Sequence, residues 1–397
     1  MTALLRPLRV FLVGTEFFRT PGGIQQVNCL LLETLLEFSR QTPLEVEVFS
    51  FGDVQGSQPE FLSRHRGFQW HPFDHVRSAI GMRLAARLRA AKPHIVLFTH
   101  AQLLQLGRMV KLLAPRARLA VLGHGVEVWK PLTPSIQREL VRADSVIAPS
   151  RFTRDKLVEL NKVSESRVEI LPHGLPPNWS EAPQVTATHR TGTRLLSVTR
   201  IGLADTYKGL DAVLDALPAV LARHPGARYI IAGDGSDRAR LEKRAQSLGV
   251  LSHVEFRGQV SNDDLHRLYA ESDIFVLPSQ KEGFGIVFLE AMYYHLPVVA
   301  ARVAGALDVV VDGVTGALVT PNEPGELAGI LCGLLEDAPR RLAWGEAGRQ
   351  RVDVNFLFTH FAARWQRWLV QQVPEAVYTA RQSAAFSTYR ALEASPA

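Results

Sequence analysis

The chain lacks the features of a secreted protein. It has only two cysteines, Cys29 and Cys332, one in each half of its 397 residues. Two such distant cysteines provide neither a disulfide framework nor a metal cluster, which is typical of a reducing compartment. The first apolar segment, Val10–Val13, is too short for the core of a signal peptide. These absences predict a cytoplasmic protein.

Long apolar runs and two common nucleotide motifs are also missing. The most apolar stretch, residues 296–320, is interrupted by Arg302, Asp308 and Asp312, so it falls short of the roughly 18 consecutive apolar residues of a transmembrane helix. No G-x-G-x-x-G motif follows a strand pattern, which argues against an NAD-dependent oxidoreductase. No Walker A lysine is present either. Aromatic residues are not interleaved with basic ones, so we expect no nucleic-acid partner.

Apolar runs of strand length alternate with helical patterns along most of the chain. The run Leu8–Val13 precedes a helical pattern at 25–38, and the run at 194–200 precedes another at 210–223. This alternation predicts α/β domains with doubly wound parallel sheets. Residues 176–192 are rich in proline and threonine and lack periodicity, so we interpret them as a linker. The length allows two domains of ~150 residues each.

Positive charge is concentrated in the first half. Residues 1–180 contain 23 lysines and arginines and 15 acidic residues, a net charge of +8, whereas the remainder has a net charge of −2. The segment from Arg77 to Lys92 combines five basic residues with apolar residues at helical spacing. Two interpretations remain: a packed helix with a solvated basic face, or a helix that docks on an anionic membrane surface.

The segment Ser279–Pro297 lies between two further runs of strand length. Gly283 and Gly285 permit a tight turn, and a helical pattern starts at Ile286 and ends before Pro297. This pattern predicts a helix that begins at the carboxyl end of a strand. Such a helix start offers free amide groups to a phosphate.

Two glutamates accompany this turn. Glu282, seven further residues and Glu290, with Gly283-Phe284-Gly285 between them and Ala-Met after, resemble the E-x7-E signature of retaining glycosyltransferase family 4. The resemblance implies that Glu282 binds hydroxyl groups of a donor sugar and that Glu290 binds the nucleotide ribose. It also implies that the turn from Gly283 to Ile286 meets the diphosphate.

Other segments resemble the same family. Gly22-Gly23 match a Gly-Gly pair near the donor diphosphate and the acceptor, and His124-Gly125 match a segment that faces the donor sugar. Arg200 and Lys208 match by type the two cations that neutralise the diphosphate, although their spacing is longer than usual. His173 departs from the family, which usually has asparagine there. His100, in contrast, we interpret as a structural, hydrogen-bonded histidine.

The resemblance implies the GT-B fold, in which two Rossmann-like domains face each other across a cleft. We assign residues 1–175 to an acceptor-binding domain, 176–192 to the linker and 193–357 to a nucleotide-sugar-binding domain. Residues 358–397 form an amphipathic helix expected to cross back to the first domain, and a tail. No D-x-D pair occurs, so we expect neither a metal nor a cofactor besides the substrate, a nucleotide-sugar such as a UDP- or GDP-hexose.

The expected activity is transfer of a sugar from this donor to an acceptor hydroxyl, with retention at the anomeric carbon. The acceptor would be a glycan or a lipid-linked molecule, in polysaccharide or glycolipid assembly. Two alternatives remain open. A nucleotide-sugar 2-epimerase shares the fold and needs no acceptor, and a non-catalytic sugar-nucleotide binding protein would show no turnover.

Overall fold

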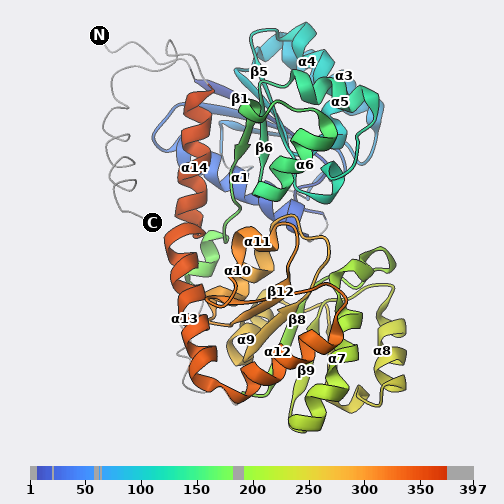
Figure 1. Ribbon diagram of the computed structural model, residues 1–397. Coiled ribbons are helices and arrows are strands. Elements are labelled where there is room, and N and C mark those ends of the chain that lie inside the picture. Colours follow the sequence, from blue (N-terminus) through green and yellow to red (C-terminus); the bar gives the residue numbers. More distant parts are fainter. Residues whose placement is uncertain (1–6, 20–21, 58–61, 63–64, 182–191, 373–397) are drawn as a thin grey trace. The chain divides into compact units, whose positions relative to one another are not determined.

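The computed structural model describes residues 7–19, 22–57, 62, 65–181 and 192–372. Within these ranges the chain forms two compact units (Figure 1). Unit 1 contains the residues up to Pro172 and the segment that begins at Phe358, and unit 2 extends from His173 to Leu357. Part of the predicted linker, 182–191, and the predicted tail after residue 372 lie outside the described residues.

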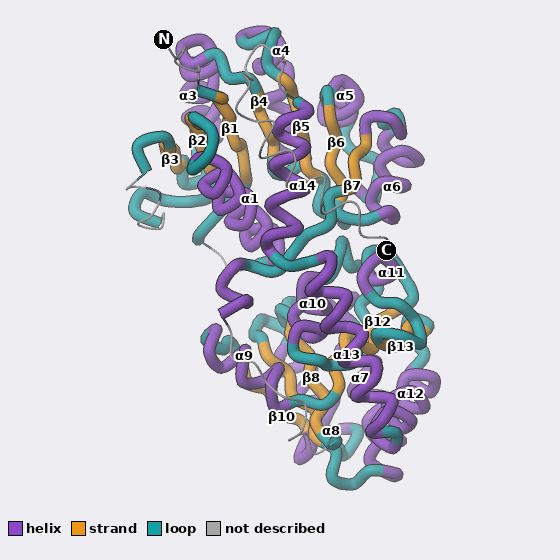
Figure 2. Tube along the Cα trace, turned by 90° about the vertical axis from the view of Figure 1, so that its left-hand side faces the viewer, coloured by secondary structure: helices purple, strands orange, loops and turns teal. Residues whose placement is uncertain are grey.

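Unit 1 is built on a seven-stranded sheet in the order β3-β2-β1-β4-β5-β6-β7, which Figure 2 shows from left to right. Every neighbouring pair is parallel, so each connection is a crossover. The strands are β1 (Leu8–Gly14), β2 (Leu44–Ser50), β3 (Phe68–Pro72), β4 (Ile95–Phe98), β5 (Arg118–Leu122), β6 (Ser145–Ala148) and β7 (Val168–Ile170).

Helices cover both faces of this sheet. The α-helices are α1 (Gly23–Ser39), α3 (Arg77–Ala91), α4 (Gly107–Leu113), α5 (Pro134–Arg142), α6 (Arg151–Asn161) and α14 (Phe358–Gln371). Short 3₁₀ helices are η1 (Ala101–Leu106), η2 (Val126–Val128) and η3 (Glu165–Arg167). Helix α4 follows η1 directly, since η1 ends at Leu106 and α4 begins at Gly107.

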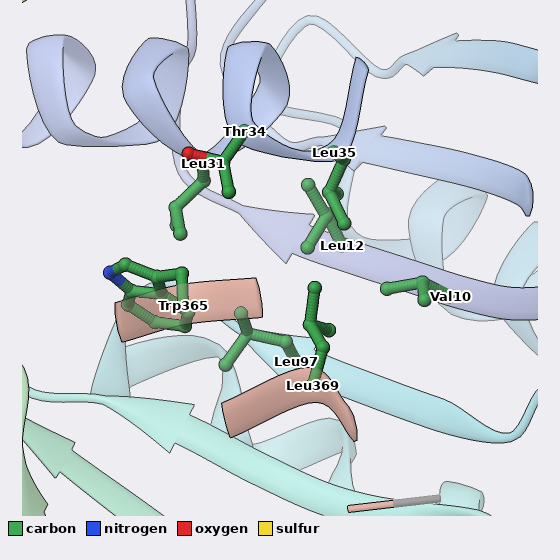
Figure 3. Close-up of a pocket in the computed structure, with 8 residues that line it drawn as sticks. All are labelled: Val10, Leu12, Leu31, Thr34, Leu35, Leu97, Trp365 and Leu369. Atoms are coloured by element: carbon green, nitrogen blue, oxygen red, sulfur yellow. The ribbon is translucent and has the colours of Figure 1, made fainter. Parts of the chain in front are cut away.

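Alternate residues of β1 point to opposite faces of the sheet and pack into two different hydrophobic cores. Phe11 and Val13 belong to a cluster with α3, α4, α5 and α6, whereas Val10 and Leu12 face α1 and α14. Figure 3 shows Trp365 of α14 directed into this second core. The space left there is about 10 Å³, at the lower limit for one water molecule, so it is a packing gap and not a ligand site.

The predicted amphipathic helix at 358–372 forms as α14 and completes unit 1. It packs on α1 and buries Phe361, Trp365 and Trp368. Trp368 Nε1 donates to Ser145 Oγ and to a carboxylate oxygen of Glu169, both at 3.1 Å. These contacts join the last described helix of the chain to β6 and β7.

Unit 2 has a six-stranded parallel sheet in the order β10-β9-β8-β11-β12-β13. Its strands are β8 (Arg194–Val198), β9 (Arg228–Ala232), β10 (Val254–Gly258), β11 (Ile274–Leu277), β12 (Val298–Ala301) and β13 (Gly316–Val319). The two parallel sheets confirm the predicted doubly wound α/β class.

The helices of unit 2 pack in pairs, α7 against α12 and α10 against α13. They are α7 (Leu210–Arg223), α8 (Arg238–Ser247), α9 (Asn262–Glu271), α10 (Ile286–Tyr293), α11 (Ala306–Val309), α12 (Pro324–Glu336) and α13 (Ala338–Asn355). Its 3₁₀ helices are η4 (Pro177–Glu181), η6 (Leu203–Lys208) and η7 (Leu251–His253). Two strand-to-helix connections, β8 to α7 and β11 to α10, carry most of the predicted donor-site residues.

Candidate functional site

The connection from β11 to α10 forms the strand, turn and helix that the sequence predicts. Gly285 is the residue before α10 and has a φ of +94°, in the left-handed region. A Cβ atom there would lie 2.3 Å from Cδ2 of Phe288, so only glycine fits without a shift. Helix α10 begins at the next residue, Ile286. Its first backbone amides therefore lie at the edge of the sheet where the parallel strands end.

A second loop reaches the same edge of the sheet, because β8 and β11 are neighbouring parallel strands. Tyr207 O accepts a hydrogen bond from Gln280 N at 2.8 Å. Gly209 has a φ of +81°, and a Cβ atom there would lie 2.5 Å from the carbonyl oxygen of Pro278. The loop after β8 therefore lies directly on the turn after β11, with Lys208 between these two contacts in sequence.

This approach brings together two predicted site residues that are far apart in the chain. Lys208 Nζ donates to Glu282 Oε2 at 2.8 Å, and the two side chains are 17% and 15% exposed. Burial alone would lower the pKa of the Lys208 ammonium, but the charge and hydrogen bond of Glu282 outweigh burial and hold that pKa above its usual value. The site therefore holds a permanent cation beside a carboxylate.

Arg200 lies near this pair but is more solvated. Its side chain is 67% exposed, and Nη2 lies 3.4 Å from Asp205 Oδ1. Tyr207 also donates to that oxygen, at 3.2 Å. The charge of Arg200 is close enough to oppose the rise in the pKa of Lys208. Its assignment as a second diphosphate cation stays a prediction.

Glu290 and Phe284 are both buried. Glu290 is 6% exposed, and its Oε2 accepts a hydrogen bond from the hydroxyl of Tyr269 at 2.8 Å. The ring of Phe284 is 3% exposed and packs edge-on against His173 and Phe356, with ring centroids 5.3 and 5.9 Å away. Phe284 thus anchors the turn through its side chain, which leaves its backbone as the part available to a ligand.

His124, in unit 1, is held as a neutral imidazole. It is 8% exposed, its Nε2 donates to Thr99 O at 2.7 Å, and its backbone amide donates to a carboxylate oxygen of Glu127 at 2.5 Å. Burial lowers the pKa of His124 to about 4, although the hydrogen bond to Thr99 opposes that shift. Since Nε2 carries the proton, Nδ1 of the neutral ring has acceptor character.

The other predicted residues of unit 1 are Gly22 and Gly23, at the start of α1. Gly22 precedes the helix with extended backbone, and a Cβ atom on Gly23 would meet nothing within 4 Å. Open space therefore lies beside this helix start. His100 has the predicted structural role, because its Nδ1 accepts a hydrogen bond from Gln102 N and caps η1.

Comparisons with known proteins agree with this arrangement. The model of Glycosyltransferase Family 4 matches residues 21–179, and that of Glycosyl transferases group 1 matches residues 183–351. A GDP-mannose-dependent alpha-(1-6)-phosphatidylinositol monomannoside mannosyltransferase of Mycobacterium tuberculosis is 34% identical over 275 residues, which cover 64% of this chain and 71% of that protein. This chain belongs to glycosyltransferase family 4.

Solved structures confirm the GT-B fold of this glycosyltransferase. The Anabaena protein HepE, in complex with UDP, has a TM-score of 0.74 at 20% identity and covers 92% of this chain and 100% of its own. Sucrose-phosphate synthase of Thermosynechococcus elongatus has a TM-score of 0.73 at 20% identity, with 92% and 98% covered. A glycogen synthase of Mycobacterium tuberculosis is 30% identical over 235 residues, covering 59% of this chain and 53% of that protein.

Two residues that organise the sites of this glycosyltransferase were not singled out from its sequence. One is Tyr269, the partner of Glu290. The other is Asp53, which is fully buried and accepts hydrogen bonds from the backbone amides of Phe17 and Arg19 at 2.7 and 2.8 Å. Asp53 thereby shapes the loop between β1 and α1. Its position shortly after the apolar run of β2 was the signal that could have identified it.

Neither a metal cluster nor a membrane span is found in the described part of this glycosyltransferase. No three histidine, cysteine, aspartate or glutamate side chains among the described residues gather closely enough to hold a metal ion. No helix within those residues is both long and apolar enough to cross a membrane.

Proposed function

We propose that this family 4 glycosyltransferase moves a hexose from a UDP- or GDP-hexose to an acceptor hydroxyl, with retention at the anomeric carbon and without a metal ion. The observation that carries the proposal is the contact between Lys208 and Glu282 beside the start of α10. A nucleotide-sugar presents a diphosphate and a polyhydroxylated ring next to each other. A cation, a helix start and a carboxylate side by side match these two chemistries.

The relatives support this class of donor. HepE was solved in complex with UDP-glucose, and the mycobacterial relative is GDP-mannose-dependent. The name of that relative also describes transfer to a phosphatidylinositol mannoside, which supports a lipid-linked or glycan acceptor here. Polysaccharide or glycolipid assembly is the setting that we propose.

The reaction breaks the bond between the anomeric carbon and the diphosphate and forms one to the acceptor oxygen. The bonding electrons leave with the diphosphate, so negative charge grows on its oxygen. Lys208, the first amides of α10 and Arg200 are the groups that we assign to stabilise this charge. The acceptor proton passes to the departing diphosphate oxygen, which is on the same face as the attacking hydroxyl when configuration is retained.

Glu282 and His124 have other roles in this proposal. Glu282 accepts hydrogen bonds from hydroxyl groups of the donor sugar while its other contact, to Lys208, holds the carboxylate in place. His124 is neutral, and we assign its ring to the donor sugar, as the likeness to the family implies. We assign the donor to unit 2 and the acceptor to unit 1.

A panel of nucleotide-sugars tests the proposal. A ligand at ~100 times its dissociation constant adds ~2.7 kcal/mol of stability, so UDP- or GDP-hexoses should raise the melting temperature and nucleotide-sugars with other bases should not. The donor identified in this way is then incubated with acceptors, and NMR of the product reports the anomeric configuration. Activity that survives a chelator supports metal independence. An altered sugar nucleotide in the absence of any acceptor would identify an epimerase instead.

We also propose that unit 1 docks on an anionic membrane surface through α3. This helix buries Ile80, Leu84 and Leu88, and Arg87 is bound to Glu47 at 2.6 and 2.8 Å. Its remaining basic residues are exposed: Arg77, Arg83, Arg89 and the following Lys92. Met82, 69% exposed, lies among them and adds an apolar contact.

A further inference from the structure

One residue outside the predicted set controls the geometry of Glu290. Tyr269 comes from α9, and its hydroxyl donates to Glu290 Oε2 at 2.8 Å, with both side chains buried. The last torsion of a glutamate is intrinsically broad, so a carboxylate without such a partner samples many orientations. A hydrogen bond from a fixed donor to one oxygen selects the plane in which the carboxylate lies.

The donor is itself held rigidly. The ring of Tyr269 is fully buried and stacks on Tyr294 with centroids 5.9 Å apart and 6° between their planes. Phe275 packs at 6.0 Å, and Trp179 packs edge-on at 5.9 Å. Burial and the charge of Glu290 raise the pKa of Tyr269 well above 10, so the phenol remains a donor at physiological pH. The hydroxyl therefore has little freedom to leave Glu290.

We propose that Tyr269 is a positioning residue that orients the Glu290 carboxylate toward the ribose hydroxyls of the bound nucleotide. Tyr269 thereby sets the preference of the site for ribonucleotides over deoxynucleotides. The proposal rests on the proposed function, because it assumes that Glu290 binds ribose. It assigns to a fully buried tyrosine an effect on ligand selectivity that its packing alone would not predict.

The substitution Tyr269→Phe removes the hydroxyl and keeps the ring. Titration calorimetry with UDP and GDP identifies the preferred nucleotide, and its 2′,3′-dideoxy analogue serves as the second probe. We expect the variant to bind the nucleotide about 5- to 10-fold more weakly, in the range of one lost hydrogen bond to a charged group, and to bind the dideoxy analogue as the wild type does. At saturating donor, kcat should change less than about twofold.

Tyr294→Phe is the matched control. It removes a hydroxyl from the same aromatic cluster, and that hydroxyl is hydrogen-bonded to Nδ1 of His266 at 2.9 Å. The thermal stability of Tyr294→Phe should fall as much as that of Tyr269→Phe. Its selectivity for ribose should equal that of the wild type. Equal loss of selectivity in both variants, or wild-type selectivity in Tyr269→Phe, overturns the positioning role.

Glu290→Ala separates this result from a failure of the proposed function. If Glu290→Ala binds the nucleotide as tightly as the wild type, Glu290 does not bind ribose, and the proposed site and the role of Tyr269 are both wrong. If Glu290→Ala loses affinity and selectivity while Tyr269→Phe keeps both, the ribose contact stands and only the positioning role is wrong. If both variants lose nucleotide affinity and selectivity for ribose, the results support the ribose contact of Glu290 and the positioning role of Tyr269.

Discussion

The candidate residues of the two units differ in charge: those of unit 2 form an ion pair, whereas the histidine of unit 1 is neutral. In unit 2, Lys208 and Glu282 lie 2.8 Å apart, and Glu282 holds the pKa of the Lys208 ammonium above its usual value. In unit 1, His124 is buried beside a backbone carbonyl and stays neutral. Both arrangements result from burial, but only the first supplies a partner of opposite charge. A buried charged side chain that binds a charged ligand therefore needs a partner of opposite charge. A buried side chain that binds hydroxyl groups can be a single neutral ring.

Removing the carboxylate of unit 2 should have the largest effect. We expect Glu282→Ala to lower kcat by on the order of 10³-fold or more, because both the sugar contact and the partner of Lys208 are lost. Affinity for the nucleotide should change only modestly, since the proposed partners of Glu282 are sugar hydroxyls. Steady-state kinetics and calorimetry check both parts. Turnover close to that of the wild type would remove Glu282 from the site.

Removing the charge of Lys208 should have the second-largest effect. Lys208→Ala should lower kcat ~10²- to 10³-fold, the range for loss of one group that stabilises a developing anion. Lys243→Ala, an exposed lysine on α8, is the control and should leave kcat unchanged. The double variant with Glu282→Ala should lose less than the two single losses combined, because the residues act as a pair. A loss below tenfold in Lys208→Ala would contradict the assignment.

The neutral histidine of unit 1 should appear in the pH dependence of stability. The folded pKa of about 4 is below the unfolded value of about 6.5, so only the unfolded chain binds this proton between those values. Stability is therefore unaffected above pH 6.5 and falls as the pH drops toward 4, by at most about 3 kcal/mol from this group.

Urea unfolding at pH 7 and pH 5 measures this effect. The pH-dependent loss should be smaller in His124→Asn than in the wild type. Identical pH dependence in His124→Asn and the wild type would show that His124 is not buried as a neutral group.

The smallest effect concerns the surface of unit 1. Each basic residue near an anionic leaflet contributes ~1 kcal/mol, so replacing Arg77 and Arg83 with glutamine should weaken vesicle binding by ~10-fold or more. Sedimentation with anionic and neutral vesicles measures it, with Lys243→Gln as control. Binding should also weaken with salt, as the Debye length shrinks from ~10 Å at 0.1 M to ~3 Å at 1 M. Equal recovery on both kinds of vesicle would leave these residues as a solvated helix face.

The sequence predicted most elements because their apolar periodicity is strong. The apolar run at 194–200 contains β8, and the helical pattern predicted at 210–223 forms as α7. Among the strands and α-helices of the described residues, two were missed. β3 is an edge strand whose Phe68 alone is buried, so it lacks an apolar run, and α5 buries only Ile136 and Leu140 among its apolar residues. Elements that contribute little to a core leave little periodicity to detect.

The candidate site was predictable in its residue types but not in its contacts. The E-x7-E spacing indicated Glu282 and Glu290, since both are in one turn and helix. Lys208 could be paired with Glu282 only through the adjacency of β8 and β11, which is a property of the sheet and not of the spacing. Tyr269 reaches Glu290 from another helix, α9. Its place in the apolar pattern of that helix does not distinguish it from an ordinary core residue.

The return of α14 to unit 1 has a consequence for how the protein is made. A ribosome delivers residues 1–172 first, yet Trp365 and Trp368, which fill the core beside β1 and β6, are delivered only after the whole of unit 2. Until then the apolar residues of α1 that pack on α14, including Leu31 and Leu35, lack that neighbour. Unit 2 is continuous in sequence and can complete its core earlier. The unit that is synthesised first therefore matures last, and a chain that stops short of α14 exposes an apolar face for quality control to recognise.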